Sequence, residues 1–272
     1  MEDFASYILE EQDLGQKMVI AYYLSKKTGI FFDKSIVLKA EIARIYMDYM
    51  KLEVDKNLVL TAMLLCNCKK IDNAQKIGKL ETFAKDGASY LESLGFNKRF
   101  CKICEEVNRY SGNEEREPEG DILEIVDQFV GLILNRVERE AFTTQEAIIV
   151  LKERNMKASN NRYMDSFIQF VEEMEKIYIR EVIDVPVIKK LVNLHNKEAN
   201  VKTFIAILSN KYSKKINNVL IKKGKMEAKE LFEEDDSVTE YEVLQKRNVR
   251  ALFSSEIANK VINHESKYKV EE

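Results

Sequence analysis

Four cysteines are the residues of this chain with the clearest capacity for metal chemistry. They form two pairs, Cys66-x-Cys68 and Cys101-x-x-Cys104. Four thiolates are a common ligand set for structural zinc, so a zinc site is one interpretation. However, both pairs fall in segments with a helical pattern, and residues two apart on a helix point about 200° apart. Because free cysteine is also a common buried residue, we expect these four to pack in the core.

Asp127 is the one charged residue whose surroundings demand an explanation. It lies in residues 121–136, a segment that is otherwise almost entirely apolar. A buried, unpaired carboxylate is costly or takes up a proton. We therefore expect this carboxylate to pair with Lys70, Asn67 or Asn108. As a relic it should tolerate asparagine with a mild effect, unless a buried cation depends on it. The alternative is a residual contact with a metal ion or ligand.

The elements that position these residues are predicted to be helices. Among 272 residues there are two prolines and nine glycines, which leaves few tight turns. No segment alternates strictly between apolar and polar residues, so we predict no sheet. Gly29 should end the first helix, and Thr143 with Glu146 should cap another. Helical patterns cover residues 1–30, 34–51, 56–69, 79–94, 98–110, 121–136, 161–179 and 241–264, with a polar loop at 111–120.

A change of composition near Pro186 predicts a domain boundary, because a proline begins or breaks a helix. Between Pro186 and Glu230 there are 11 lysines and three acids, and an acidic run follows at 233–236. Clustered lysines can bind nucleic acid or an acidic partner. This stretch lacks the arginine forks and interleaved aromatics of nucleic-acid sites, so we expect a solvated helical face.

Composition places the chain among ordinary globular proteins. Hydrophobic residues make up 45% and charged residues 33%, and the net charge is -3. That balance provides no global field that would attract nucleic acid. No apolar run approaches the roughly 18 residues that span a bilayer, and the acidic N-terminus does not resemble a signal peptide. We therefore expect a cytoplasmic protein whose partners include neither a membrane nor nucleic acid.

Six segments in order carry a resemblance to a known family. The run Ala62-Met63-Leu64-Leu65-Cys66-Asn67-Cys68-Lys69-Lys70-Ile71 resembles the A-x-L-L-H-D-I-G-K-I helix of HD phosphohydrolases. Family-like segments follow it at residues 76–80, 87–91, 109–112, 122–129 and 136–147. On this basis residues 36–176 resemble an HD-GYP domain. That branch of the HD superfamily hydrolyses cyclic di-GMP at a site of two or three iron ions.

The resemblance implies which positions would have held the metal, and nearly all have lost their ligands. These vestigial positions are Leu38, Cys66, Asn67, Phe83, Glu106, Val107 and Asp127. Only Asp127 keeps the family's residue, and the G-Y-P tripeptide is absent. The two histidines, His195 and His264, lie outside the block and are expected at the surface. Leu, Val and Phe donate nothing to iron, and without a metal no water is activated. We therefore expect no catalytic residue, no bound metal and no cofactor.

The resulting expectation is an all-α protein with an HD-like helical bundle and additional C-terminal helices. Its parts would be an N-terminal helical segment (1–35), the HD-GYP-like domain (36–183) and a C-terminal region (184–272). The expected function is regulatory or scaffolding, through contacts with another protein. One alternative is a sensor that binds a nucleotide such as cyclic di-GMP without turnover. Another is a phosphohydrolase with a rebuilt metal site that uses Asp127, Glu105, Glu106 and Asp86 or Asp72.

Overall fold

The computed structural model describes residues 4–70, 83–107, 116–136, 139–155 and 160–226. These residues form helices apart from one short sheet, which confirms the all-α class. From the N-terminus the helices are α1 (Phe4–Glu10), α2 (Leu14–Thr28), α3 (Lys34–Tyr49), α4 (Lys56–Leu65), α6 (Phe83–Ser93), α7 (Lys98–Glu105), α8 (Pro118–Ile133), α9 (Thr144–Arg154), α10 (Met164–Met174), α11 (Val187–Lys197), α12 (Val201–Ile207) and α13 (Ser213–Lys222), with the π-helix η2 (Leu208–Tyr212) between the last two.

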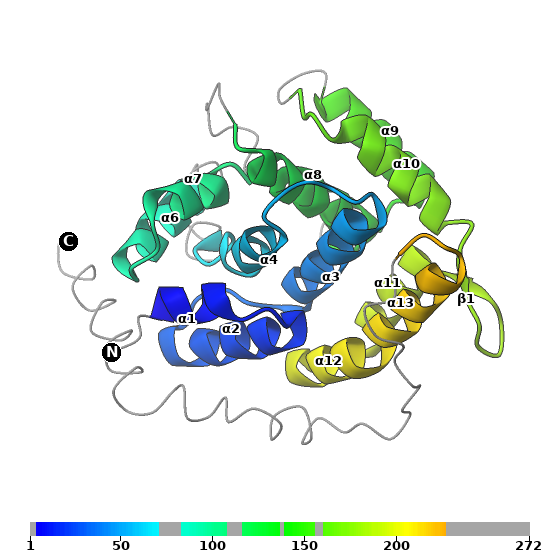
Figure 1. Ribbon diagram of the computed structural model, residues 1–272, viewed down its shortest axis with the longest axis horizontal. Helices are drawn as coiled ribbons and strands as arrows, with labels where there is room; N and C mark the ends of the chain where they lie inside the picture. The colour runs from blue at the N-terminus through cyan, green and yellow to red at the C-terminus, as the bar shows by residue number, and fades with distance from the viewer. Residues whose placement is uncertain (1–3, 71–82, 108–115, 137–138, 156–159, 227–272) are drawn as a thin grey trace.

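Helices α3, α4 and α8 form the centre of the fold, and each packs against the other two (Figure 1). Helix α4 is also covered by α1, α2 and α7. All eight residues from Leu58 to Leu65 are buried. An apolar helix needs neighbours on every side, so this arrangement is what its composition requires. Of the described residues, none belongs to a helix long and apolar enough to cross a membrane.

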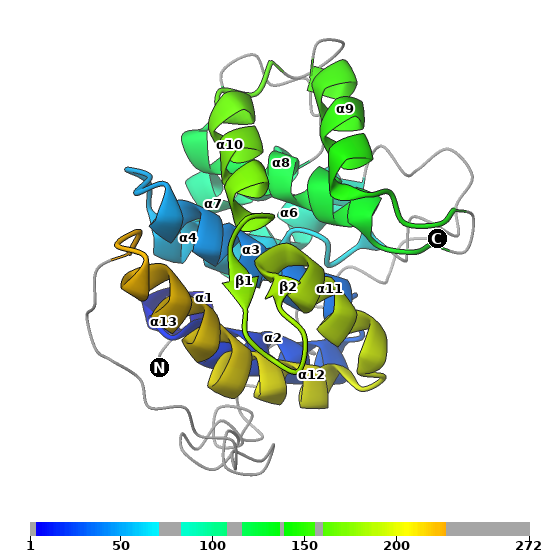
Figure 2. The ribbon, with the colours of Figure 1, turned by 90° about the vertical axis from the view of Figure 1, so that its right-hand side faces the viewer.

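The C-terminal helices share the core of the preceding ones. Helix α11 packs against α3, and α12 packs against α2 and α3 (Figure 2). One cluster of buried apolar side chains runs from Ala5 to Leu220. Helix α11 begins directly after Pro186, as predicted for that proline. The division into domains stays a prediction.

Local signals in the sequence place several helix ends correctly. Gly29 ends α2 with a φ of 73°, a left-handed conformation that glycine adopts without strain. Thr143 and Glu146 form a capping box at the start of α9. In contrast, α8 begins at Pro118 rather than at residue 121, since proline suits the first position of a helix. The helix predicted at 241–264 lies outside the described residues.

One further prediction, the absence of a sheet, was wrong. The chain does form a sheet, in which β1 (Tyr178–Ile179) pairs antiparallel with β2 (Val185–Pro186). Strands of two residues are too short to produce visible alternation. His195, predicted at the surface, is half-buried there, and its ring meets Phe204 edge-on with 5.8 Å between centroids. Burial lowers the pKa of His195. His264 lies outside the described part of the chain.

Candidate functional site

The three central helices each direct one polar side chain to the same point. Lys39 comes from α3, Asn67 follows the end of α4, and Asp127 comes from α8. Lys39 Nζ donates a hydrogen bond to Asp127 Oδ1 at 2.7 Å, and Asn67 Nδ2 donates to the same oxygen at 3.0 Å. The Lys39 and Asp127 side chains are only 5% and 17% exposed, and Asn67 is fully buried. We call these three residues the Asp127 cluster.

Opposite charges keep the Asp127 cluster ionised at neutral pH. Burial by itself would raise the pKa of Asp127, but the nearby charges of Lys39 and Lys70 hold it well below the usual range. Burial would likewise lower the pKa of Lys39, but the Asp127 carboxylate more than compensates and raises it. Asp127 by itself would raise the pKa of Lys70. Burial and the positive charges of Lys39 and Arg136 outweigh that effect, so the pKa of Lys70 is lowered.

Some of the vestigial positions gather at this cluster. Of the three partners predicted for Asp127, Asn67 donates a hydrogen bond to it, Lys70 acts through its charge, and Asn108 lies outside the described residues. Cys66 precedes Asn67 at the end of α4. Burial raises the pKa of the Cys66 thiol, so it stays protonated and is a poor nucleophile. Phe83 begins α6, and its ring centroid lies 5.5 Å from Lys70 Nζ. These positions therefore surround a satisfied ion pair rather than a reactive group.

The partner that sequence reasoning missed is Lys39. Leu38, which the resemblance assigned to the first ligand position, is fully buried in the apolar core. Its neighbour Lys39 supplies the contact instead. In the sequence Lys39 stands between the apolar run Ile36-Val37-Leu38 and Ala40, which was the available signal. Val107 is also buried, just beyond α7.

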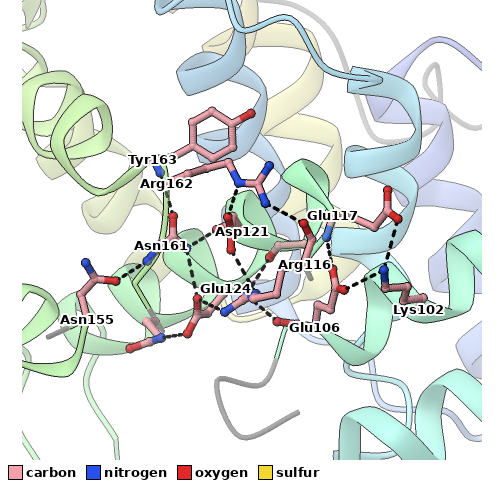
Figure 3. A network of polar contacts seen from close by, with 12 residues as sticks. Lys102, Glu106, Arg116, Glu117, Asp121, Glu124, Asn155, Asn161, Arg162 and Tyr163 are labelled. Carbon is pink, nitrogen blue, oxygen red and sulfur yellow. Dashed lines mark hydrogen bonds and ion pairs between the residues drawn. The ribbon is translucent and has the colours of Figure 1, made fainter. Parts of the chain in front are cut away.

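Glu106 belongs to a different group of charges, shown in Figure 3. It caps the C-terminus of α7 and meets the start of α8, where the Glu117 backbone N–H donates to Glu106 Oε2 at 3.0 Å. The two helices approach so closely that a β-carbon at Gly120 would overlap that oxygen. Gly120 precedes Asp127 by two turns of α8, or about 10 Å along the axis. The structure therefore separates Glu106 from the Asp127 cluster.

Glu106 belongs to a group of polar side chains that we call the Arg116 network. Its members are Glu106, Arg116, Asp121, Glu124, Asn161 and Arg162. Arg116 Nη1 lies 2.8 Å from Glu124 Oε2, and its Nε lies 3.0 Å from Asp121 Oδ1. Arg162 Nε donates to the other Asp121 oxygen at 2.6 Å. Asn161 Nδ2 donates to Glu124 Oε2 at 3.1 Å. The network joins the end of α7, the first turns of α8 and the turn before α10 (Figure 3).

Glu106 is the member of this network with the weakest compensation. Burial raises its pKa to about 7, although the Glu117 N–H and the charges of Lys102 and Arg116 partly oppose that rise. The Lys102 ammonium remains 3.8 Å from Glu106 Oε1. Glu106 therefore changes its charge near neutral pH.

The remaining metal hypotheses concern cysteines and carboxylates. All four cysteines are buried as unoxidised thiols, which confirms the predicted core packing. The described residues contain no group of three or more His, Cys, Asp or Glu side chains placed to hold a metal ion. Of the carboxylates considered for a rebuilt site, Asp86 is exposed and Asp72 lies outside the described ranges.

No family model, curated protein or solved structure matches this chain. The resemblance to HD-GYP domains stays a prediction from the sequence.

Asp127→Asn should lower the free energy of unfolding by about 3–5 kcal/mol at pH 7, because it leaves Lys39 buried without a counter-ion. Because Asp127 pairs with Lys39, we expect this larger loss of stability in place of the mild effect predicted from the sequence. Adding Lys39→Met to the variant should restore much of the loss. Urea unfolding measures both, with Asp184→Asn as an exposed control that should change stability by under about 0.5 kcal/mol. A loss below about 1 kcal/mol for Asp127→Asn would contradict a structural role for the pair.

Glu106→Gln should stabilise the protein more at pH 8 than at pH 5. With a raised pKa, folded Glu106 keeps its proton at pH values where the unfolded chain has lost it, so wild-type stability falls as pH rises toward 8. After allowance for screening by water, we expect a difference of about 1–2 kcal/mol between the two pH values. The exposed change Glu153→Gln is the matched control. An equal effect of Glu106→Gln at both pH values would refute the raised pKa.

Proposed function

We propose that this protein is a catalytically inactive, HD-GYP-like protein that regulates or organises another protein through direct contact. The observation that carries the proposal is the 2.7 Å contact between Lys39 Nζ and Asp127 Oδ1. In the alignment by resemblance, Asp127 is the last surviving metal ligand. Here its carboxylate is engaged by an ammonium group of the chain itself.

The chemistry of the cluster supports an inactive site. A divalent metal ion at Asp127 would have to displace Lys39 and then lie beside two positive charges, Lys39 and Lys70, in a poorly hydrated region where repulsion is strong. The neighbouring Cys66 thiol is protonated at neutral pH. Without a bound metal ion there is no means at this site of activating water for attack on phosphorus.

Exposed apolar side chains on the hairpin between β1 and β2 support the proposal that the chain binds another protein. Val182 and Ile183 in its loop are 103% and 75% exposed, and Tyr178 on β1 is half exposed. Figure 1 shows the segment after β1 at the edge of the molecule. Adjacent apolar side chains in water are stabilised when a partner covers them. The hairpin is therefore the surface that we assign to the partner.

The purified protein should carry no stoichiometric iron, manganese or zinc, and should hydrolyse no cyclic di-GMP with added Mn²⁺ or Fe²⁺. The reason is that Lys39 neutralises Asp127 and the other vestigial positions supply no sufficient donor set. Elemental analysis and a turnover assay test this, with Asp127→Ala as the control. Turnover that disappears in Asp127→Ala would overturn the proposal in favour of a rebuilt metal site. Binding without turnover would favour the alternative of a nucleotide sensor.

Replacing both Val182 and Ile183 with glutamate should leave the melting temperature unchanged and abolish capture of the partner from the native cell extract. The physical reason is that a charge in a covered apolar contact must be desolvated. Ile149→Glu is the matched control, since Ile149 is 58% exposed on α9. Affinity capture followed by mass spectrometry identifies proteins bound by the wild type and by Ile149→Glu but lost in the hairpin variant. Equal capture by all three would exclude the hairpin as the contact surface.

A further inference from the structure

A cavity of about 520 Å³ lies between the N-terminal helices α2, α3 and α4 and the C-terminal elements η2 and α13. Its volume falls within the range of small-molecule sites, which is roughly 300–1,000 Å³. No member of the Asp127 cluster or of the Arg116 network lines it. One wall is the π-helix η2, a rare element that occurs often at functional sites. Figure 2 shows α12 alongside α2, although the two helices are far apart in the sequence.

Charged groups in the cavity already compensate one another. Glu41 binds Arg44 through both oxygens, at 2.7 and 3.0 Å. Asp48 lies 3.4 Å from Arg44 Nη1 and 2.8 Å from Lys56 Nζ. A ligand with several negative charges, such as a nucleoside triphosphate, would meet these carboxylates without gaining unpaired cations. The electrostatics therefore favour an uncharged ligand.

Two amide side chains on opposite walls have unused hydrogen-bonding capacity. Gln16, on α2, is only 7% exposed, and its Oε1 accepts no hydrogen bond from the described residues. Asn217, on α13, has a buried Oδ1 that likewise lacks a partner among those residues. A buried acceptor without a partner is costly, and the last bond of an amide side chain rotates readily. Rotation toward the cavity would let a ligand N–H group satisfy each oxygen.

The two sides of the cavity differ in character. Beside charged and amide side chains, the N-terminal helices contribute the apolar residues Leu14, Met18, Met47 and Leu60, each of which is largely buried. Thioether and leucine side chains pack well against the flat face of an aromatic ring. The C-terminal side contributes the hydroxyl groups of Ser209 and Ser213 and the amide of Asn210. Amide side chains pair with the donors and acceptors on the edge of a base.

We infer that this cavity binds an uncharged nucleobase or nucleoside, held mainly by hydrogen bonds to the amides of Gln16 and Asn217, with its ring near the edges of Leu14 and Leu60. The ligand bridges α2 to α13 and so stabilises the packing of the C-terminal helices on the N-terminal ones. This binding is separate from the proposed inactive site, and it makes the state of the C-terminal helices depend on ligand concentration.

The experiment is a titration of the full chain with adenosine, guanosine, cytidine, uridine and their free bases, followed by calorimetry and melting temperature. At least one should bind saturably and raise the melting temperature. Gln16→Met and Asn217→Leu should each weaken binding by about tenfold or more, as expected for a lost hydrogen bond in a buried site. The melting temperature of the ligand-free variants should stay unchanged or rise, because an unpartnered oxygen is removed.

Gln169→Met is the matched control, since Gln169 is exposed on α10 and does not line the cavity. It should keep wild-type affinity. The inference is overturned if no base or nucleoside binds at millimolar concentration, or if binding survives both cavity substitutions. Preferential binding of a nucleoside triphosphate or of a free amino acid would also overturn it. Ligand binding at the cavity is measured independently of cyclic di-GMP turnover. A failure of the cavity proposal therefore does not affect the proposal of an inactive site, and a failure of the inactive-site proposal does not affect the cavity proposal.

Discussion

The ion pair between Lys39 and Asp127 is the constraint around which the core is organised. Each of the three central helices supplies one member of the Asp127 cluster, and burying its charges costs more than their attraction returns unless the geometry is good. In the observed arrangement Lys39 and Asn67 both reach one carboxylate oxygen, and a different relative rotation of α3, α4 or α8 would break one of these contacts. Apolar packing alone would tolerate small shifts of these helices. We therefore expect the pair to contribute more to the choice of a single packing than to net stability.

The Arg116 network applies the same principle where α7, α8 and the turn before α10 meet. Arginine suits this position because its planar group can serve several acceptors at once, and Arg116 contacts both Asp121 and Glu124. Glu106 is the exception, since its closest ammonium group is 3.8 Å away and burial raises its pKa to about 7. Apart from Glu106, the charged side chains of the two groups each lie against a side chain of opposite charge. Such groups hold helices in place and have little tendency to react.

The surfaces that could meet other molecules lie away from this closed centre. The exposed hairpin loop with Val182 and Ile183 offers apolar side chains to a protein. The cavity between α2 and α13 offers amide and hydroxyl groups to a small ligand. Both involve the C-terminal helices or the hairpin that leads into them. Because these helices share the apolar core with α2 and α3, events at either surface can alter how they pack.

Local physical chemistry allowed the sequence by itself to determine the helical class, the enclosed helix α4, the end of α2 at Gly29 and the need of Asp127 for a partner. Helical periodicity, caps and the cost of a buried charge all act within a few residues or on one residue. Only the tertiary structure decided that the partner is Lys39, 88 residues away, and that Glu106 belongs to another network. It also placed His195 against Phe204. Such pairings depend on how helices distant in sequence rotate and pack against one another. The periodicity of each helix does not determine that packing.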